Sequence, residues 1–375
     1  MKDDLDQEKT DESALHVMDG VDIPPALNPD LTFRSRVKIR RRPDAAALID
    51  GVRRGDRVLL SQAITLIESE RPEDRKTAAQ VLEAVMPEAG RSLRIGITGV
   101  PGVGKSTFIE SFGLHLVEGG HKLAVLAVDP SSVRSHGSIL GDKTRMELLS
   151  RERNAYIRPT ASGATPGGVA RHTRETILLV EAAGFDRILI ETVGVGQSEV
   201  IVHSMVDFFM LLSLPGAGDE LQGMKRGIME MADGIVITKA DGDNISRAKI
   251  AAADLNRALH LFPAREDGWT VPVRLTSAIT GEGLVELASL LEGYIEQMTE
   301  KGLFADRRRR QALFWMQQAI DEHLKQDFER TVAARREEIA ERVESGAINP
   351  FEAAERLIEL YHKELRSRIS HSDNA

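Results

Sequence analysis

The first residues whose types and spacing could do chemistry lie close to position 100. Gly99, Gly104, Lys105 and Ser106 belong to the run GVPGVGKS, which matches G-x-x-x-x-G-K-[ST] at every fixed position. An apolar run, 94–98, precedes it and a helical pattern follows it. In this motif backbone N–H groups cradle phosphate oxygens, the lysine reaches the β- and γ-phosphates, and the hydroxyl binds Mg²⁺. We therefore expect a nucleoside triphosphate to contact Gly99, Val100, Pro101, Gly102, Val103, Gly104, Lys105, Ser106 and Thr107.

A second group is an acid at the end of a second apolar run. Residues 187–191 end in Glu191, which is the Walker-B arrangement, where the carboxylate holds Mg²⁺ directly or through water. Gly194 follows three residues later and can offer its N–H to the γ-phosphate. The long interval between Lys105 and Glu191 leaves room for an additional βα unit.

A third group predicts which base is bound. Thr238, Lys239 and Asp241 form T-K-x-D, which resembles the guanine-recognition motif of GTPases. Asp241 can accept hydrogen bonds from the guanine N1–H and 2-amino group, a donor pair that adenine lacks. The Lys239 stem can cover the base plane. Ser277 and Ala278, after another apolar run, resemble the loop whose backbone N–H reaches the guanine O6.

Two further acids are candidates for metal or switch roles. Asp129 ends the apolar run 123–128, and Asp142 lies in the run GDKTR. Asp129 can also be interpreted as a turn starter before Pro130, and Asp142 as a helix N-cap. The sequence leaves both alternatives open.

The elements that must position these groups alternate between short apolar runs and amphipathic helical patterns. The expected strands are 94–98, 123–128, 187–191, 208–214, 234–238 and 271–276. Most of them are apolar nearly throughout, as parallel strands covered on both faces are. This pattern predicts an α/β fold with a doubly wound, mostly parallel sheet that carries the phosphate loop.

Helical patterns flank this region on both sides. Leu313, Met316, Ile320, Leu324 and Phe328 step by three or four residues along one long helix, and a second helix begins at Pro350. Such a hairpin must dock its apolar stripe on the α/β body, on a partner or on a second copy. We expect a disordered or extended arm over 1–43 and a helical N-terminal subdomain over 44–92. A P-loop domain should follow over 93–299, and a C-terminal helical hairpin over 300–375. The basic run within 34–42 is either a solvated segment or a contact for an anion or partner.

Composition excludes several classes of function. The chain has no cysteine, which removes disulfides, thiolate nucleophiles and Cys-ligated metal sites. Its net charge of −9 argues against non-specific nucleic-acid binding. The longest apolar run is too short to cross a bilayer, and the first residues are acidic without an apolar core. We expect a cytoplasmic protein that uses neither a membrane nor nucleic acid as partner.

Taken together, these motifs resemble one family, the methylmalonyl-CoA mutase-associated G-protein chaperones (MeaB, ArgK and human MMAA type) of the SIMIBI class of P-loop GTPases. The most specific matching runs are ETVGVGQSEV and LPGAGDELQG. The resemblance implies Mg²⁺ contacts by Ser106, Asp129, Asp142 and Glu191. It also implies switch segments at 130–145, 193–204 and 215–227, and a homodimer formed through the C-terminal helices. Family members gate adenosylcobalamin delivery to a cobalamin-dependent acyl-CoA mutase and protect it, and an adenosyltransferase is a further candidate partner.

The expected reaction is GTP + H₂O → GDP + phosphate, with catalytic roles for Lys105, Asp142, Glu191, Gly194 and Lys225. No glutamine follows Gly194 directly to orient water, so hydrolysis should be slow alone and faster when a partner orders the switches. Two alternatives remain. A metallochaperone GTPase on the same scaffold would be expected to carry Cys or His clusters, and a P-loop kinase would need an acceptor site with a base.

Overall fold

The computed structural model describes residues 42–69, 71–128, 146–159, 166–192, 198–216 and 226–372. The chain divides into two compact units, Met1–Arg42 and Pro43–Ala375. All elements below belong to the second unit.

A single sheet of seven parallel strands forms the centre of this unit, in the order β3-β2-β4-β1-β5-β6-β7. Since β1 lies inside the sheet and the strand order runs away from it in both directions, the predicted doubly wound α/β topology is confirmed. In such sheets ligands bind at the carboxyl ends of the strands where the order reverses. The strands are β1 (Leu93–Gly99), β2 (Leu123–Val128), β3 (Ala155–Pro159), β4 (Arg187–Thr192), β5 (Phe208–Ser213), β6 (Gly234–Ile237) and β7 (Val273–Leu275).

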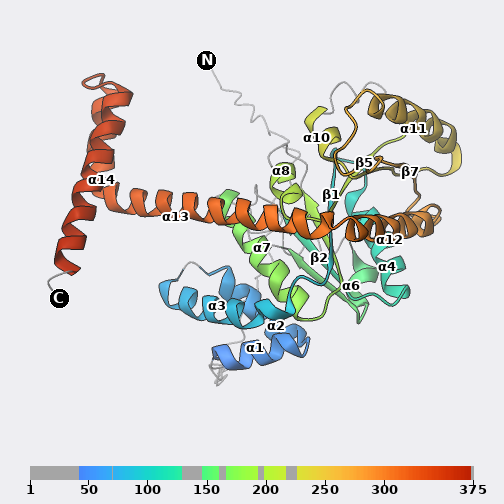
Figure 1. Cartoon of the computed structure of the whole chain (residues 1–375), viewed down its shortest axis with the longest axis horizontal. Coiled ribbons are helices and arrows are strands. Elements are labelled where there is room, and N and C mark those ends of the chain that lie inside the picture. Colours follow the sequence, from blue (N-terminus) through green and yellow to red (C-terminus); the bar gives the residue numbers. More distant parts are fainter. Residues whose placement is uncertain are drawn as a thin grey trace, which may run out of the picture. The chain divides into compact units, whose positions relative to one another are not determined.

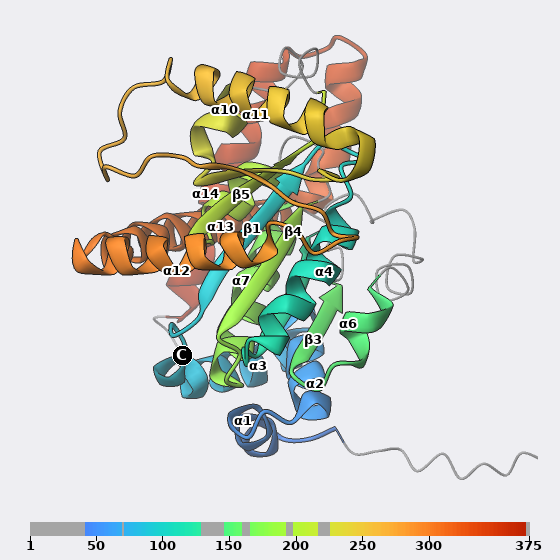
Figure 2. The same ribbon diagram turned by 90° about the vertical axis from the view of Figure 1, so that its right-hand side faces the viewer.

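Helices cover both faces of the sheet. One face, with buried residues such as Ile188 and Ile190, packs against α1 (Ala45–Arg53), α2 (Arg57–Ile67), α3 (Pro72–Val85), α7 (Pro166–Ala182) and α8 (Ser198–His203). The other face packs against α4 (Lys105–Glu118), α6 (Glu147–Arg151) and α12 (Leu284–Glu300), and α4 and α12 cross in front of the strands in Figure 2. A third cluster joins β6 and β7 to α10 (Arg226–Met231) and α11 (Ile245–Leu259).

The N-terminal helices begin where the sequence supplies caps. The Asp44 carboxylate accepts a hydrogen bond from the Ala47 N–H at 2.8 Å, and Asp56 caps α2 in the same way. Pro72 occupies the first position of α3, as the sequence predicts, with acids in the first turn. Of these helices, α2 rests on the β3 side of the sheet, where the Ser61 and Tyr156 hydroxyls lie 3.0 Å apart. β3 itself was not among the expected strands.

Two helices end the chain, α13 (Leu303–Glu344) and α14 (Pro350–Ser372), with Gly302 and Gly346 in left-handed turns before and after α13. Residues Ile339, Ile348 and Ala353 hold the two helices together (Figure 1). Along α13, Leu313, Met316, Ile320 and Leu324 stay 62%, 56%, 43% and 55% exposed. Four of the five residues of the predicted apolar stripe are therefore not covered by the described residues of their own chain, whereas the ring of Phe328 packs against Tyr361 of α14. Within the described ranges, we find no helix that is long and apolar enough to cross a membrane.

Candidate nucleotide-binding site

The phosphate loop leaves the carboxyl end of β1 and opens into α4. Gly99 has φ 157°, and a Cβ there would lie 2.7 Å from the Leu212 carbonyl oxygen. Gly104 has φ 91° and is the N-cap of α4, where none of the described side chains forms a cap. The first intrahelical bond of α4 runs from the Phe108 N–H to the Gly104 carbonyl. The N–H groups of this helix end are therefore directed toward the site where a phosphate would lie.

Lys105 points back along the loop. Its Nζ donates to the Gly99 carbonyl at 2.8 Å. Burial lowers the pKa of Lys105, and the negative charges of Glu191 and Glu199 partly oppose this shift. The ammonium is therefore placed among the loop carbonyls and two carboxylates, in position to meet anionic oxygens.

Ser106 and Glu191 come together although they belong to different elements. Parallel pairing of β1 with β4 sets Ile97 opposite Glu191. The Ser106 hydroxyl, in the first turn of α4, donates to Glu191 Oε1 at 3.4 Å. A hydroxyl and a carboxylate are oxygen donors of the kind Mg²⁺ prefers, so this pair fits the predicted metal.

The other predicted phosphate and metal residues cannot be placed in this way. Asp129, Asp142, Gly194 and Lys225 lie outside the described residues, as do the segment 130–145 and parts of 193–204 and 215–227. Among the residues that are described, no three His, Asp or Glu side chains gather closely enough to hold a metal. The described residues thus bring together two of the four residues that are expected to contact Mg²⁺.

The base-recognition segments are attached to each other at the ends of β6 and β7. The Ser277 hydroxyl donates to Asp241 Oδ2 at 2.5 Å. The Ala240 N–H donates to the Thr276 carbonyl at 3.0 Å. Ala278 follows Ser277 in the same loop. The Asp241 carboxylate is therefore held in one orientation before any base arrives.

The same segment is also attached to the phosphate loop. Thr238, which stands where many GTPases have asparagine, donates through Oγ1 to the Val103 carbonyl at 2.8 Å. Lys239 has φ 55°, and its Nζ donates to the Gly102 carbonyl at 2.9 Å. The spacing between the base-recognition and phosphate-binding groups is thus fixed by two side chains.

Sequence reasoning missed Glu199. It lies in the first turn of α8, is 3% exposed, and acts electrostatically on Lys105. In the sequence, Glu199 is the acid that ends the run ETVGVGQSE. Until the fold is known, such an acid cannot be distinguished from one that stabilises the first turn of a helix.

Comparison with known proteins agrees with this arrangement. Residues 60–333 match the family model described as methylmalonyl Co-A mutase-associated GTPase MeaB. A probable GTPase of Mycobacterium tuberculosis, Rv1496, is 51% identical over 84% of this chain and 94% of its own length. The mitochondrial methylmalonic aciduria type A homolog of Mus musculus is 47% identical over 84% of this chain and 79% of its own length.

A bacterial relative and a solved structure support the same family assignment. GTPase ArgK of Escherichia coli is 45% identical over 74% of this chain and 85% of its own length. A crystal structure named LAO/AO transport system kinase superposes with a TM-score of 0.66 at 36% identity, covering 85% of this chain and 97% of that one. The chain therefore belongs to the methylmalonyl-CoA mutase-associated GTPase (MeaB) family.

Proposed function

We propose that this GTPase is a G-protein chaperone that gates adenosylcobalamin delivery to a cobalamin-dependent acyl-CoA mutase and protects that enzyme. The proposed binding of guanosine nucleotides is carried by one observation, the connection between the base-recognition segment and the phosphate loop. Ser277 holds the Asp241 carboxylate, and hydrogen bonds from Thr238 and Lys239 fix its distance from the phosphate loop. The mutase part is supported by the names of the matching family model and of the mouse relative.

Within the site, the chain's own groups have separate roles. Asp241 would accept hydrogen bonds from the guanine N1–H and 2-amino group, and Lys105 would move from the Gly99 carbonyl to the β- and γ-phosphates. Ser106 and Glu191, with Asp129 and Asp142, would hold Mg²⁺, which supplies charge neutralisation at the phosphate oxygens. Gly194 and Lys225 are proposed to contact the γ-phosphate.

Slow hydrolysis by the chain alone is part of the proposal. Positioning and electrostatic stabilisation dominate phosphoryl transfer, so an incompletely assembled site retains binding but loses rate. A partner that orders the segments around the γ-phosphate would raise the rate. Such coupling requires the mutase to bind the GTP form and the GDP form with different affinities.

A second copy of this chain is the proposed occupant of the apolar stripe on α13. Leu313, Met316, Ile320 and Leu324 repeat at helical spacing over about three turns and are exposed. Two copies of one stripe are self-complementary about a two-fold axis. The family resemblance supports a homodimer through these helices, and an adenosyltransferase remains a further proposed partner.

The test uses the full-length chain and the cobalamin-dependent acyl-CoA mutase of the same organism. GTP hydrolysis is followed as free phosphate, with and without the mutase, and transfer of adenosylcobalamin is followed by absorbance with GTP, with GDP or with no nucleotide. We expect the mutase to accelerate phosphate release and the nucleotide to change transfer. An unchanged rate together with nucleotide-independent transfer would contradict the chaperone role, and phosphate found on an acceptor would indicate a kinase instead.

A further inference from the structure

Helix α8 lies unusually close to the central strand β1. A Cβ built on Gly96 of β1 would come within 2.9 Å of Val202 Cγ1 and 3.1 Å of Val206 Cγ2. Both valines are fully buried. The glycine therefore allows this short helix to pack directly on the strand that leads into the phosphate loop, and a shift of α8 must be felt by its packed neighbours.

The first turn of α8 carries a buried acid whose charge acts on the phosphate loop. Glu199 is 3% exposed and sits in the first turn of the helix. Its charge acts on Lys105, the residue expected to bind the β- and γ-phosphates. An anionic phosphate bound by Lys105 would be repelled by the Glu199 carboxylate, so a γ-phosphate would bias the position of this helix end.

The turn that follows α8, residues 204–206, is hydrogen-bonded to α13. Trp315 Nε1 donates to the carbonyl of Ser204 at 3.0 Å, and Gln311 Nε2 donates to the carbonyl of Val206 at 2.7 Å. Gln311 and Trp315 are 8% and 9% exposed. Arg174 of α7 covers the Trp315 ring, with its guanidinium carbon 5.2 Å from the ring centroid. A shift of this turn must either move α13 or leave the carbonyl groups of Ser204 and Val206 unpaired.

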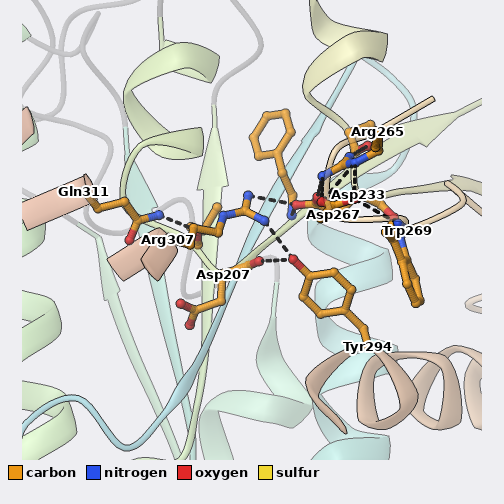
Figure 3. A network of polar contacts seen from close by, with 11 residues as sticks. Asp207, Asp233, Arg265, Asp267, Trp269, Tyr294, Arg307 and Gln311 are labelled. Atoms are coloured by element: carbon orange, nitrogen blue, oxygen red, sulfur yellow. Dashed lines mark hydrogen bonds and ion pairs between the residues drawn. The ribbon is translucent and has the colours of Figure 1, made fainter. Parts of the chain in front are cut away.

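The turn of α13 just before these residues is anchored independently of α8. Arg307 donates to Asp233 Oδ2 at 2.9 Å and to the Tyr294 hydroxyl at 2.7 Å, so it lies between them in Figure 3. Arg308 donates to both oxygens of Asp207 at 2.8 and 2.7 Å. These acids stand at the amino ends of the strands, opposite the nucleotide. They fix one point of α13 at the amino ends of β5 and β6.

We propose that α8 couples the nucleotide site to the direction of α13, with Gln311 and Trp315 as the coupling residues. The inference rests on the proposed binding of guanosine nucleotides. A helix of six residues is only about 9 Å long, so its two ends move together and displace the turn 204–206 that follows directly. Because α13 carries the stripe proposed to meet a second copy, the state of the nucleotide would reach the other chain along this path.

Hydrogen–deuterium exchange of the full-length chain, loaded with GDP or with a non-hydrolysable GTP analogue, tests the path. We expect the two nucleotides to give different exchange in peptides covering 198–207 and also in peptides covering 308–318. A difference confined to 198–207 would overturn the coupling. If exchange is the same in both segments because the chain binds neither nucleotide, the result would instead count against the proposed function.

Two variants separate coupling from simple packing. Trp315→Phe removes the indole donor and keeps an aromatic ring, and Gln311→Met removes the amide donor at similar volume. Each should abolish the nucleotide difference in 308–318 while leaving that in 198–207. Gln326→Met is the matched control, because Gln326 is exposed and its side-chain amide donates to Glu322 one turn earlier on the same helix.

Reciprocity supplies a second readout. If α13 responds to the nucleotide, breaking the link must change the ratio of the dissociation constants for GDP and the GTP analogue, by about fivefold or more if the coupling has the usual size. Gln326→Met should leave the ratio unchanged. An unaltered ratio and an unaltered exchange difference in the Trp315→Phe and Gln311→Met proteins, both folded by circular dichroism, would refute the coupling.

Discussion

The Ser277 hydroxyl holds Asp241 by a hydrogen bond of 2.5 Å, and the two residues come from the ends of different strands. The pair exists in the chain before a base is bound. Since the orientation of the carboxylate is already fixed, little conformational freedom remains to be lost when guanine binds.

Asp241→Asn should therefore change which base is bound. The variant offers an amide donor where guanine also presents a donor, and it loses two charge-assisted hydrogen bonds, so GDP affinity should fall by at least about 100-fold. Xanthosine diphosphate, which carries a carbonyl in place of the 2-amino group, should bind the variant better than GDP does. Calorimetric titration with both nucleotides checks this. If the variant binds neither GDP nor xanthosine diphosphate, the substitution has caused a folding defect rather than a change in base recognition.

Gly96→Ala should destabilise the fold. The new methyl would lie 2.9 Å from Val202 and from Phe209, and overpacking of this kind costs about 1–3 kcal/mol. Urea unfolding measures the loss. Gly293→Ala on α12 is the control, because a Cβ there meets nothing within 4 Å and should stabilise the helix by about 0.5–1 kcal/mol. Equal effects of the two substitutions would contradict the close approach of α8 to β1.

His203 should make stability depend on pH below neutrality. Burial and the nearby Arg307 lower the pKa of His203 to about 4, although Asp233 opposes the shift and Arg265 adds to it. The unfolded chain takes up this proton near its ordinary pKa of 6.5. The folded chain takes it up only near pH 4, so stability is complete above about pH 6.5 and is lost as the pH falls toward 4.

The size of this loss is at most roughly 3 kcal/mol. His203→Gln should remove it, so the difference in unfolding free energy between the wild type and the variant should shrink as the pH falls from 7 to 4. His323→Gln, at an exposed position of α13, is the control. A wild type and a His203→Gln protein with parallel pH profiles would show that the imidazole is not held neutral.

Ile320→Glu should yield a monomer. It places a charge in the middle of the exposed α13 stripe, where a second copy would have to bury it unpaired. Val285→Glu changes an apolar residue of α12 that is 59% exposed and lies outside the stripe, and it should stay dimeric. Light scattering coupled to gel filtration gives the masses. If the Ile320→Glu protein is still a dimer, the dimer interface lies outside the α13 stripe.

The sequence predicted the centre of this fold well because its signals are local. The phosphate loop, the acid at the end of β4 and the T-K-x-D segment each sit at the end of an apolar strand, which short-range patterns reveal. The strand β3 was not predicted, because it is short, contains Arg158 and ends in Pro159. Only pairing with β2 makes it a strand.

Long-range relationships could not be read from the sequence. Arg307 and Arg308 belong to a run of four arginines, which by itself indicates a charged surface. In the fold both are half-buried and pair with the buried carboxylates of Asp233 and Asp207. Glu199 was missed for the same reason, since its approach to Lys105 depends on the packing of α8 against β1.

The most direct measurement is calorimetric titration of the full-length chain, in the presence of Mg²⁺, with GDP, a GTP analogue and ADP. The account predicts saturable binding of both guanosine nucleotides and at least about 100-fold weaker binding of ADP. Comparable affinity for ADP, or no binding of guanosine nucleotides by the folded protein, would contradict it.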